Sequence, residues 1–194
     1  MNVPTDDPRV LRDREKALED EFFRRQSEDL RRKLREKEAR GEHREALKQI
    51  AVVTEDATID RMLDLGITAE TWAAVSLVPL VEVAWANGQV EEQERRSVLA
   101  AAEANGVTPG SASYEILDAW LAHRPDGRLM EAWAAYIATL GADLLPREMH
   151  ALRDELMARA RHVAEAAGGF LGMGNKVSSE ERVVLEELEK AFER

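Results

Sequence analysis

The sequence predicts an all-α protein: a helical bundle with pseudo-repeated helix-turn-helix units, preceded by a long charged N-terminal helix. Ala, Leu, Glu and Arg, which favour helices, dominate the composition. Runs of alternating β-branched residues, which are typical of strands, do not occur. Apolar residues instead recur at helical spacing between breaks that contain glycine or proline. We therefore expect a flexible lead at residues 1–8, a charged extension at residues 9–53 and a bundle domain at residues 54–194.

The extension is predicted to form one long helix from about residue 9 to residue 40, which Gly41 is expected to end. Its few apolar residues form two seams, and within each seam the residues are spaced seven and then four positions apart. The first seam is Leu11, Leu18 and Phe22, and the second is Phe23, Leu30 and Leu34. Opposite charges lie four residues apart, as in Glu28 and Arg32. Such a helix either lies along the surface of the domain or pairs with another helix as a short coiled coil.

The bundle domain is predicted to contain helices with clear breaks between them. The helix that opens at Thr68 and reaches Trp85 is the most apolar, and Pro79 is expected to kink it because proline removes a hydrogen bond. Ser113 is expected to cap a later helix, and Gly141 to end the one after that. The predicted helices of the domain span about residues 54–65, 68–85, 91–104, 113–124, 129–140, 146–167 and 178–192.

Two acidic turns in this domain resemble each other. The first reads NGQVEEQER over residues 87–95, and the second reads GNKVSSEER over residues 174–182. When the two are aligned, the matching residues are Val90 with Val177, Glu94 with Glu181, Arg95 with Arg182 and Val98 with Leu185. Internal similarity of this kind indicates one supersecondary unit used twice. The unit is a helix, a turn, one apolar anchor and an acidic helix start.

The first turn and the helix before it resemble the signature of the bacterial tellurite-resistance TerB-like family. The matching residues are AWANGQVEEQE, from Ala84 to Glu94, and residues 176–181, KVSSEE, resemble the second copy. The resemblance covers about residues 76–194. It implies an all-helical bundle with pseudo-twofold character, a divalent-metal site at an acidic patch, and a role in stress response or membrane-associated assemblies. The aspartate of the signature is Asn87 here, which removes the strongest ligand of such a site.

The chemistry of the acidic turn also suggests a cation site. Glu82 is the only charge on an apolar helix, and a buried carboxylate is costly unless it is paired or binds a cation. The predicted ligands of a divalent metal, with Ca²⁺, Mg²⁺ or Zn²⁺ as candidate ions, are Glu82, Asn87, Glu91 and Glu94. The alternative is that Glu82 pairs with an arginine: Arg95, Arg147 or Arg153.

Composition narrows the classes of function. The net charge of −11 argues against nucleic-acid binding, which needs a basic surface. The absence of cysteine excludes disulfides and thiolate sites and is compatible with a reducing cytoplasm. The N-terminus lacks the apolar core of a signal peptide, and no apolar run has the length of a transmembrane helix. We therefore expect a cytoplasmic protein, and on the TerB-like resemblance we expect that it is not an enzyme.

We expect this protein to be an interaction or scaffold module with a protein partner, peripheral to a membrane-associated assembly, or paired with a second copy through the N-terminal helix. The residues predicted to meet a partner are Glu91, Glu92, Glu94, Glu180 and Glu181 in the acidic patch, and Leu18 and Phe22 in the N-terminal helix. Two alternatives stay open. One is a metal-dependent enzyme that uses the acidic turn. The other is a regulator of an ATPase, because residues 13–22 faintly resemble the start of bacterial ATP-synthase inhibitor subunits.

Overall fold

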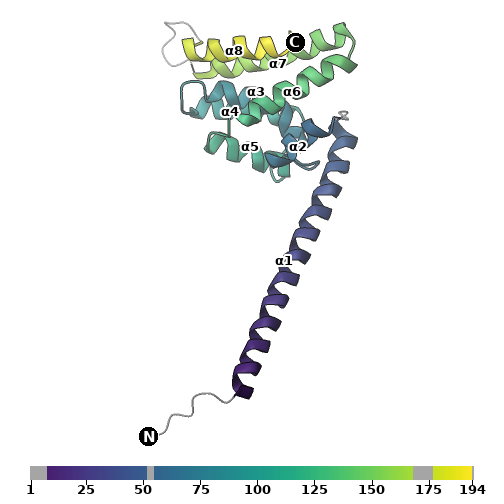
Figure 1. Cartoon of the computed structure of the whole chain (residues 1–194). Helices are drawn as coiled ribbons and strands as arrows, with labels where there is room; N and C mark the ends of the chain where they lie inside the picture. The colour runs from purple at the N-terminus through teal and green to yellow at the C-terminus, as the bar shows by residue number, and fades with distance from the viewer. Residues whose placement is uncertain (1–7, 52–54, 168–176, 194) are drawn as a thin grey trace. The chain divides into compact units, whose positions relative to one another are not determined.

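The computed structural model of the chain describes residues 8–51, 55–167 and 177–193, without the side chains of residues 8–23, 26, 27 and 167 (Figure 1). The predicted lead therefore lies outside the described residues, apart from Pro8. Every regular element among the described residues is a helix, which confirms the all-α prediction. The elements are α1 (Pro8–Ala51), α2 (Asp56–Asp64), the 3₁₀ helix η1 (Trp72–Leu77), α3 (Val78–Ala84), α4 (Glu92–Ala104), α5 (Ala112–Ala122), α6 (Arg128–Asp143), α7 (Pro146–Ala167) and α8 (Ser179–Ala191).

The chain divides into two compact units, residues 1–42 and residues 43–194. The first unit contains the greater part of α1, and the second contains the last turns of α1 and all later helices. The second unit begins earlier than the sequence suggested, because Leu47 and Ala51 near the end of α1 are fully buried in its core. The apolar stretch at the end of α1 therefore belongs to the bundle.

α1 continues through Gly41, so the expectation that this glycine ends the helix is wrong. A single glycine costs a helix about 1 kcal/mol, which the neighbouring helix formers can offset. From residue 30 to residue 42 every residue is exposed. Ion pairs within the helix support this first unit, such as Lys33 Nζ with Asp29 Oδ2 at 2.8 Å and Arg24 Nη1 with Glu28 Oε1 at 2.7 Å.

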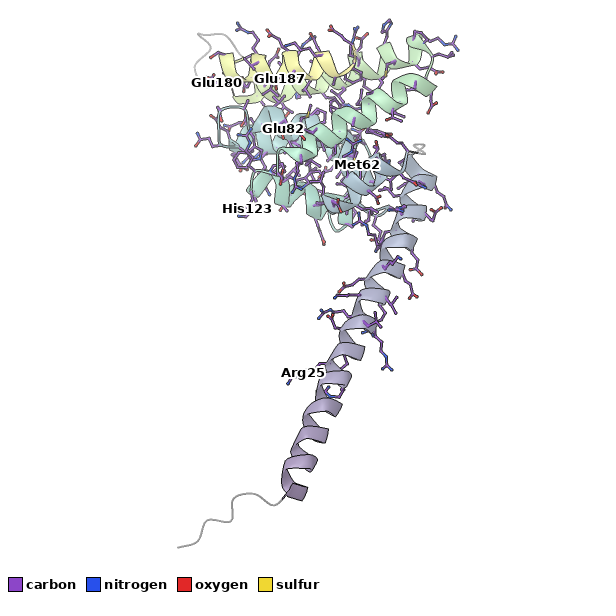
Figure 2. All side chains as sticks on the ribbon, viewed as in Figure 1. Arg25, Met62, Glu82, His123, Glu180 and Glu187 are labelled. Atoms are coloured by element: carbon purple, nitrogen blue, oxygen red, sulfur yellow. The ribbon has the colours of Figure 1, made fainter. Side chains whose placement is uncertain are left out.

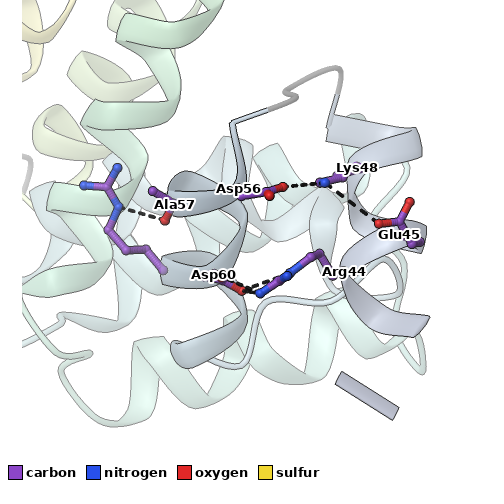
Figure 3. Close-up of polar contacts among 7 residues, drawn as sticks. Arg44, Glu45, Lys48, Asp56, Ala57 and Asp60 are labelled. Carbon is purple, nitrogen blue, oxygen red and sulfur yellow. Dashed lines mark hydrogen bonds and ion pairs between the residues drawn. The ribbon is translucent and has the colours of Figure 1, made fainter. Parts of the chain in front are cut away.

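Polar contacts inside the second unit join the last turns of α1 to α2 (Figure 3). Arg44 donates from Nε to Asp60 Oδ1 at 3.1 Å and from Nη2 to Asp60 Oδ2 at 2.6 Å. Lys48 forms an ion pair with Asp56. These partly exposed pairs add little stability individually.

α3 lies at the centre of the second unit, where it contacts α4, α5, α6, α7 and α8. All of its residues except Glu82 are buried. The single kinked helix predicted from Thr68 to Trp85 is instead the 3₁₀ helix η1 followed by α3. Pro79 occupies the first turn of α3, where its missing N–H has no helical partner to lose. The proline therefore starts an element rather than kinking one.

Two other predicted helix boundaries differ from the structure. Ser111 caps α5 by accepting a hydrogen bond from the N–H of Tyr114 at 3.2 Å. Ser113, the predicted cap, is buried and donates its hydroxyl to the carbonyl oxygen of Glu70 at 2.9 Å. α6 passes through Gly141 to Asp143. The predicted starts of the last two helices agree with α7 and α8.

Candidate functional site

The two similar acidic turns begin α4 and α8, and each places a glutamate at the third helical position. Glu94 Oε2 accepts a hydrogen bond from the N–H of Glu91 at 2.7 Å. Glu181 Oε2 accepts from the N–H of Ser178 at 2.6 Å, and Ser178 Oγ accepts from the N–H of Glu181 at 3.1 Å. This capping box satisfies backbone donors that have no partner inside the helix. The local repeat predicted from the sequence is therefore present in the structure.

The aligned residues also match in burial. Glu94 is fully buried and Glu181 is 3 % exposed. Val98 and Leu185, which lie one turn further along α4 and α8, are buried in the same core. Because carboxyl groups are rarely buried without partners, this burial points to a specific interaction between the two helix starts.

The carboxyl groups of Glu94 and Glu181 interact with each other in the core. Burial raises the pKa of Glu94 to about 7, although the hydrogen bond from the Glu91 N–H opposes this shift. The negative charges of Glu181 and Glu91 raise the pKa further. Glu94 Oε1 is buried without a hydrogen-bond partner. A proton on Glu94 would supply the missing hydrogen bond and relieve the repulsion between two carboxylates.

The partner-binding prediction for the acidic patch needs a correction. Glu94 and Glu181 are buried, so their side chains cannot contact a partner at the surface. Glu92 and Glu180 are exposed, and Glu91 is partly exposed. The reason for the difference is the position within each helix. The third residue turns back to the helix start, whereas Glu92, the first residue of α4, and Glu180, the second residue of α8, face solvent. The exposed acidic surface is therefore smaller than the sequence suggested.

Glu82 has an ion-pair partner that the sequence did not identify. Its side chain is 13 % exposed and lies 3.8 Å from Arg124, measured from Oε2 to Nη2. Burial raises the pKa of Glu82, and the positive charge of Arg124 opposes this rise. The negative charge of Glu187 on α8, labelled with Glu82 in Figure 2, raises the pKa further. Glu82 therefore pairs with an arginine, as the alternative predicted. The partner is Arg124, which is not one of the three arginines named from the sequence.

The structure does not bring the predicted metal ligands together. Asn87 is exposed, and its side-chain oxygen accepts from the N–H of Gln89 at 3.2 Å. Glu82 faces Arg124, while Glu94 is engaged with its own helix start. Over the residues that the structure describes, no group of three or more His, Cys, Asp or Glu side chains is placed to hold a metal ion. The four predicted ligands, Glu82, Asn87, Glu91 and Glu94, are therefore not gathered into one site among the described residues, and metal binding stays a prediction.

The structure describes only part of the predicted partner-binding surface of the N-terminal helix. Leu18 and Phe22 belong to α1, but their side chains lie outside the described residues. Leu30 and Leu34 on the same helix are 58 % and 50 % exposed. These two leucines are four residues apart, so they share one face of the helix.

The second unit also has an apolar groove that the sequence did not reveal. It has a volume of about 260 Å³, and the residues around it include Trp72, Tyr136, Ile137, Leu152 and Leu156. The rings of Trp72 and Tyr136 meet edge to face, with centroids 5.0 Å apart. The groove is assembled from η1, α6 and α7, which are distant in sequence, so periodicity within one helix could not have shown it.

No family model, curated protein or solved structure matches this chain. The TerB-like resemblance therefore stays a prediction based on the two acidic turns and on the helix that precedes the first. None of the helices in the described ranges combines the length and apolar character needed to cross a membrane.

Proposed function

We propose that this protein is a non-enzymatic interaction module that uses α1 to bind a protein partner. The observation that carries this proposal is the exposed stretch of α1 from residue 30 to residue 42, with Leu30 and Leu34 on one face. Ion pairs within the helix can keep this stretch helical without a core, but they give no reason for two exposed leucines on one face. A partner that covers these leucines would supply that reason.

Charge supports α1 as the contact element. Residues 24–40 carry eight basic and four acidic side chains. Residues 43–194 carry 15 basic and 26 acidic side chains, which accounts for the whole net charge of −11. The leucine face of α1 therefore lies within a locally basic segment, and this favours a partner with acidic groups.

The buried glutamate pair supports a structural role for the acidic turns in this module. Glu94 and Glu181 are buried, and each accepts a hydrogen bond at the start of its own helix, α4 or α8. On this proposal the second unit is a stable platform, and the partner contacts lie on α1. A cytoplasmic location and a stress-related role belong to the same proposal, and they rest on the absence of cysteine and on the TerB-like resemblance.

Site-specific photo-crosslinking in cells tests the proposal. A benzoylphenylalanine placed at Leu30 or Leu34 should give covalent adducts with one defined protein, identified by mass spectrometry. The matched control is the same group at Glu103, which is exposed on α4 in the second unit. Adducts at positions 30 and 34 that do not exceed those at position 103 would contradict the proposal.

A further inference from the structure

The residues of α1 are complementary to themselves when two copies of the helix run in opposite directions. Consider the register in which residue i of one copy lies level with residue 52 − i of the other, so that Gln26 lies on the twofold axis. α1 is continuous from Pro8 to Ala51, so residues 14–38 form one uninterrupted helix. Because the rise per residue is constant, positions equally distant from Gln26 lie at equal heights in the two copies.

The charges of residues 14–38 fit this register. Wherever two charged residues come level, their signs are opposite, and this happens at seven different pairs of positions. Two of these pairs, Glu15 with Lys37 and Glu19 with Lys33, lie on the side of the helix that faces the other copy. The other five pairs, such as Asp20 with Arg32, are level with each other but lie about 80–160° from the facing direction. A shift of one residue places Glu15 level with Glu36, or with Glu38 in the other direction. Since like charges that meet at an interface are unfavourable, the charge pattern selects one register.

The apolar residues fit the same register. Phe22 comes level with Leu30, and Leu18 comes level with Leu34. With 3.6 residues per turn, positions 15, 19, 22, 30, 33 and 37 all fall within about 40° of the direction of position 26. The facing side of the helix therefore has an apolar middle with Glu–Lys pairs on both sides. Of the two exposed leucines, Leu30 lies on this side, about 40° from position 26, and Leu34 lies at its edge, about 80° away, as does Leu18.

We propose that α1 is a dimerisation element, in which two copies of this chain pair antiparallel about Gln26. The second copy is then the partner that covers Leu30 and Leu34, and its residues 13–21, with five acidic and two basic side chains, meet the basic segment. The contact is isologous and closes after two chains, because the same surface serves both copies. This inference rests on the proposed function, since it names the partner of the same helix.

A charge-swap series measured by sedimentation velocity on the full chain tests the pairing. The wild type should be a dimer. Glu19→Lys and Lys33→Glu should each weaken the dimer by at least about tenfold, because each places like charges level with one another at two symmetric points. The double variant should restore the affinity to within about threefold of the wild type. Circular dichroism of every variant checks that the helix content is retained.

Glu28→Lys is the matched control. It makes the same change of charge, but position 28 lies about 160° from the facing direction of position 26. Its dimer affinity should therefore equal that of the wild type. A wild type that stays monomeric up to high micromolar concentration would overturn the proposal, and so would a double variant as weak as the single ones, since that result contradicts this register.

Disulfide trapping gives an independent test, because the chain has no cysteine. Gln26→Cys should oxidise to a covalent dimer, since position 26 meets its own copy. Glu28→Cys, on the far side of the helix, should not. Equal trapping of the two variants would contradict the twofold axis at position 26. A monomeric chain whose positions 30 and 34 crosslink to a different protein would overturn the dimer and leave the proposed interaction function standing.

Discussion

Two helices of this chain differ in what keeps them helical. α3 has seven residues, which is too short for a stable isolated helix, and all of them except Glu82 are buried. The stretch of α1 from residue 30 to residue 42 is exposed throughout and is supported by ion pairs between its own turns. α3 depends on tertiary packing, whereas this part of α1 depends on local interactions. The same substitution should therefore have different effects in the two helices.

The largest expected difference is between Leu80→Ala in α3 and Leu34→Ala in α1. Leu80 is fully buried, so its truncation leaves a cavity and should lower the free energy of unfolding by about 2–5 kcal/mol. Leu34 is half exposed, and its truncation should cost the second unit less than about 0.5 kcal/mol. Urea unfolding followed by tryptophan fluorescence measures both values, because all four tryptophans lie in the second unit. Equal losses would remove the distinction.

The next effect concerns the buried glutamate pair, whereas the carboxylates of α1 between residues 30 and 42 are all exposed. Because the pKa of Glu94 rises from 4.5 to about 7 on folding, the folded state holds this proton more tightly. The resulting stability is fully present below pH 4.5 and is lost as the pH rises through 7. Its size is at most about 3 kcal/mol. Urea midpoints between pH 4.5 and pH 8.5 should therefore fall more steeply for the wild type than for Glu94→Gln.

Glu92→Gln is the control for this pH experiment. Glu92 is exposed two residues before Glu94 in the same helix, so its neutralisation should leave the pH profile of the wild type unchanged. Other groups that titrate in this range contribute equally to all three proteins. The difference between the wild-type and Glu94→Gln profiles therefore isolates Glu94, and parallel profiles would show that the pair does not hold a proton near neutral pH.

A smaller effect is expected at the start of α8. Ser178→Ala removes the hydroxyl that accepts from the N–H of Glu181, and loss of such a cap costs about 1 kcal/mol. Ser179→Ala, one residue later, removes an exposed hydroxyl that contacts only the Glu180 side chain among the described hydrogen bonds, and it should be nearly neutral. Thermal unfolding of the two variants compares them directly. If Ser179→Ala is the more damaging change, the assignment of the cap is wrong.

The smallest effect is expected in α1. A Cβ added at Gly41 would meet no atom within 4 Å, so Gly41→Ala should stabilise the surrounding turns by less than about 1 kcal/mol. Amide hydrogen exchange should slow around position 41, while exchange in α3 stays the same. Slower exchange in both helices would show that α1 and the bundle are coupled more strongly than their separate sources of stability suggest.

The sequence predicted the features that depend on neighbouring residues. Helix composition gave the all-α class, and the alignment of Glu94 with Glu181 gave two equivalent helix starts. Capping chemistry involves residues only three positions apart, so it can be recognised without knowledge of the fold. Errors occurred where a local signal was taken as decisive. Gly41 does not end α1, because one glycine is a small cost in a long helix.

Tertiary structure alone decided how distant residues meet. The sequence could not show that Glu94 and Glu181 share one buried site, or that Glu82 pairs with Arg124. It also gave no sign that the groove beside Trp72 exists. These features depend on how α3, α4, α6, α7 and α8 pack, and the same amphipathic faces are compatible with several packings. The sequence by itself therefore determined the all-helical class and the two equivalent acidic helix starts, because capping depends on residues close together in the chain. Side-chain packing determined which helices meet, because burial depends on residues from different helices.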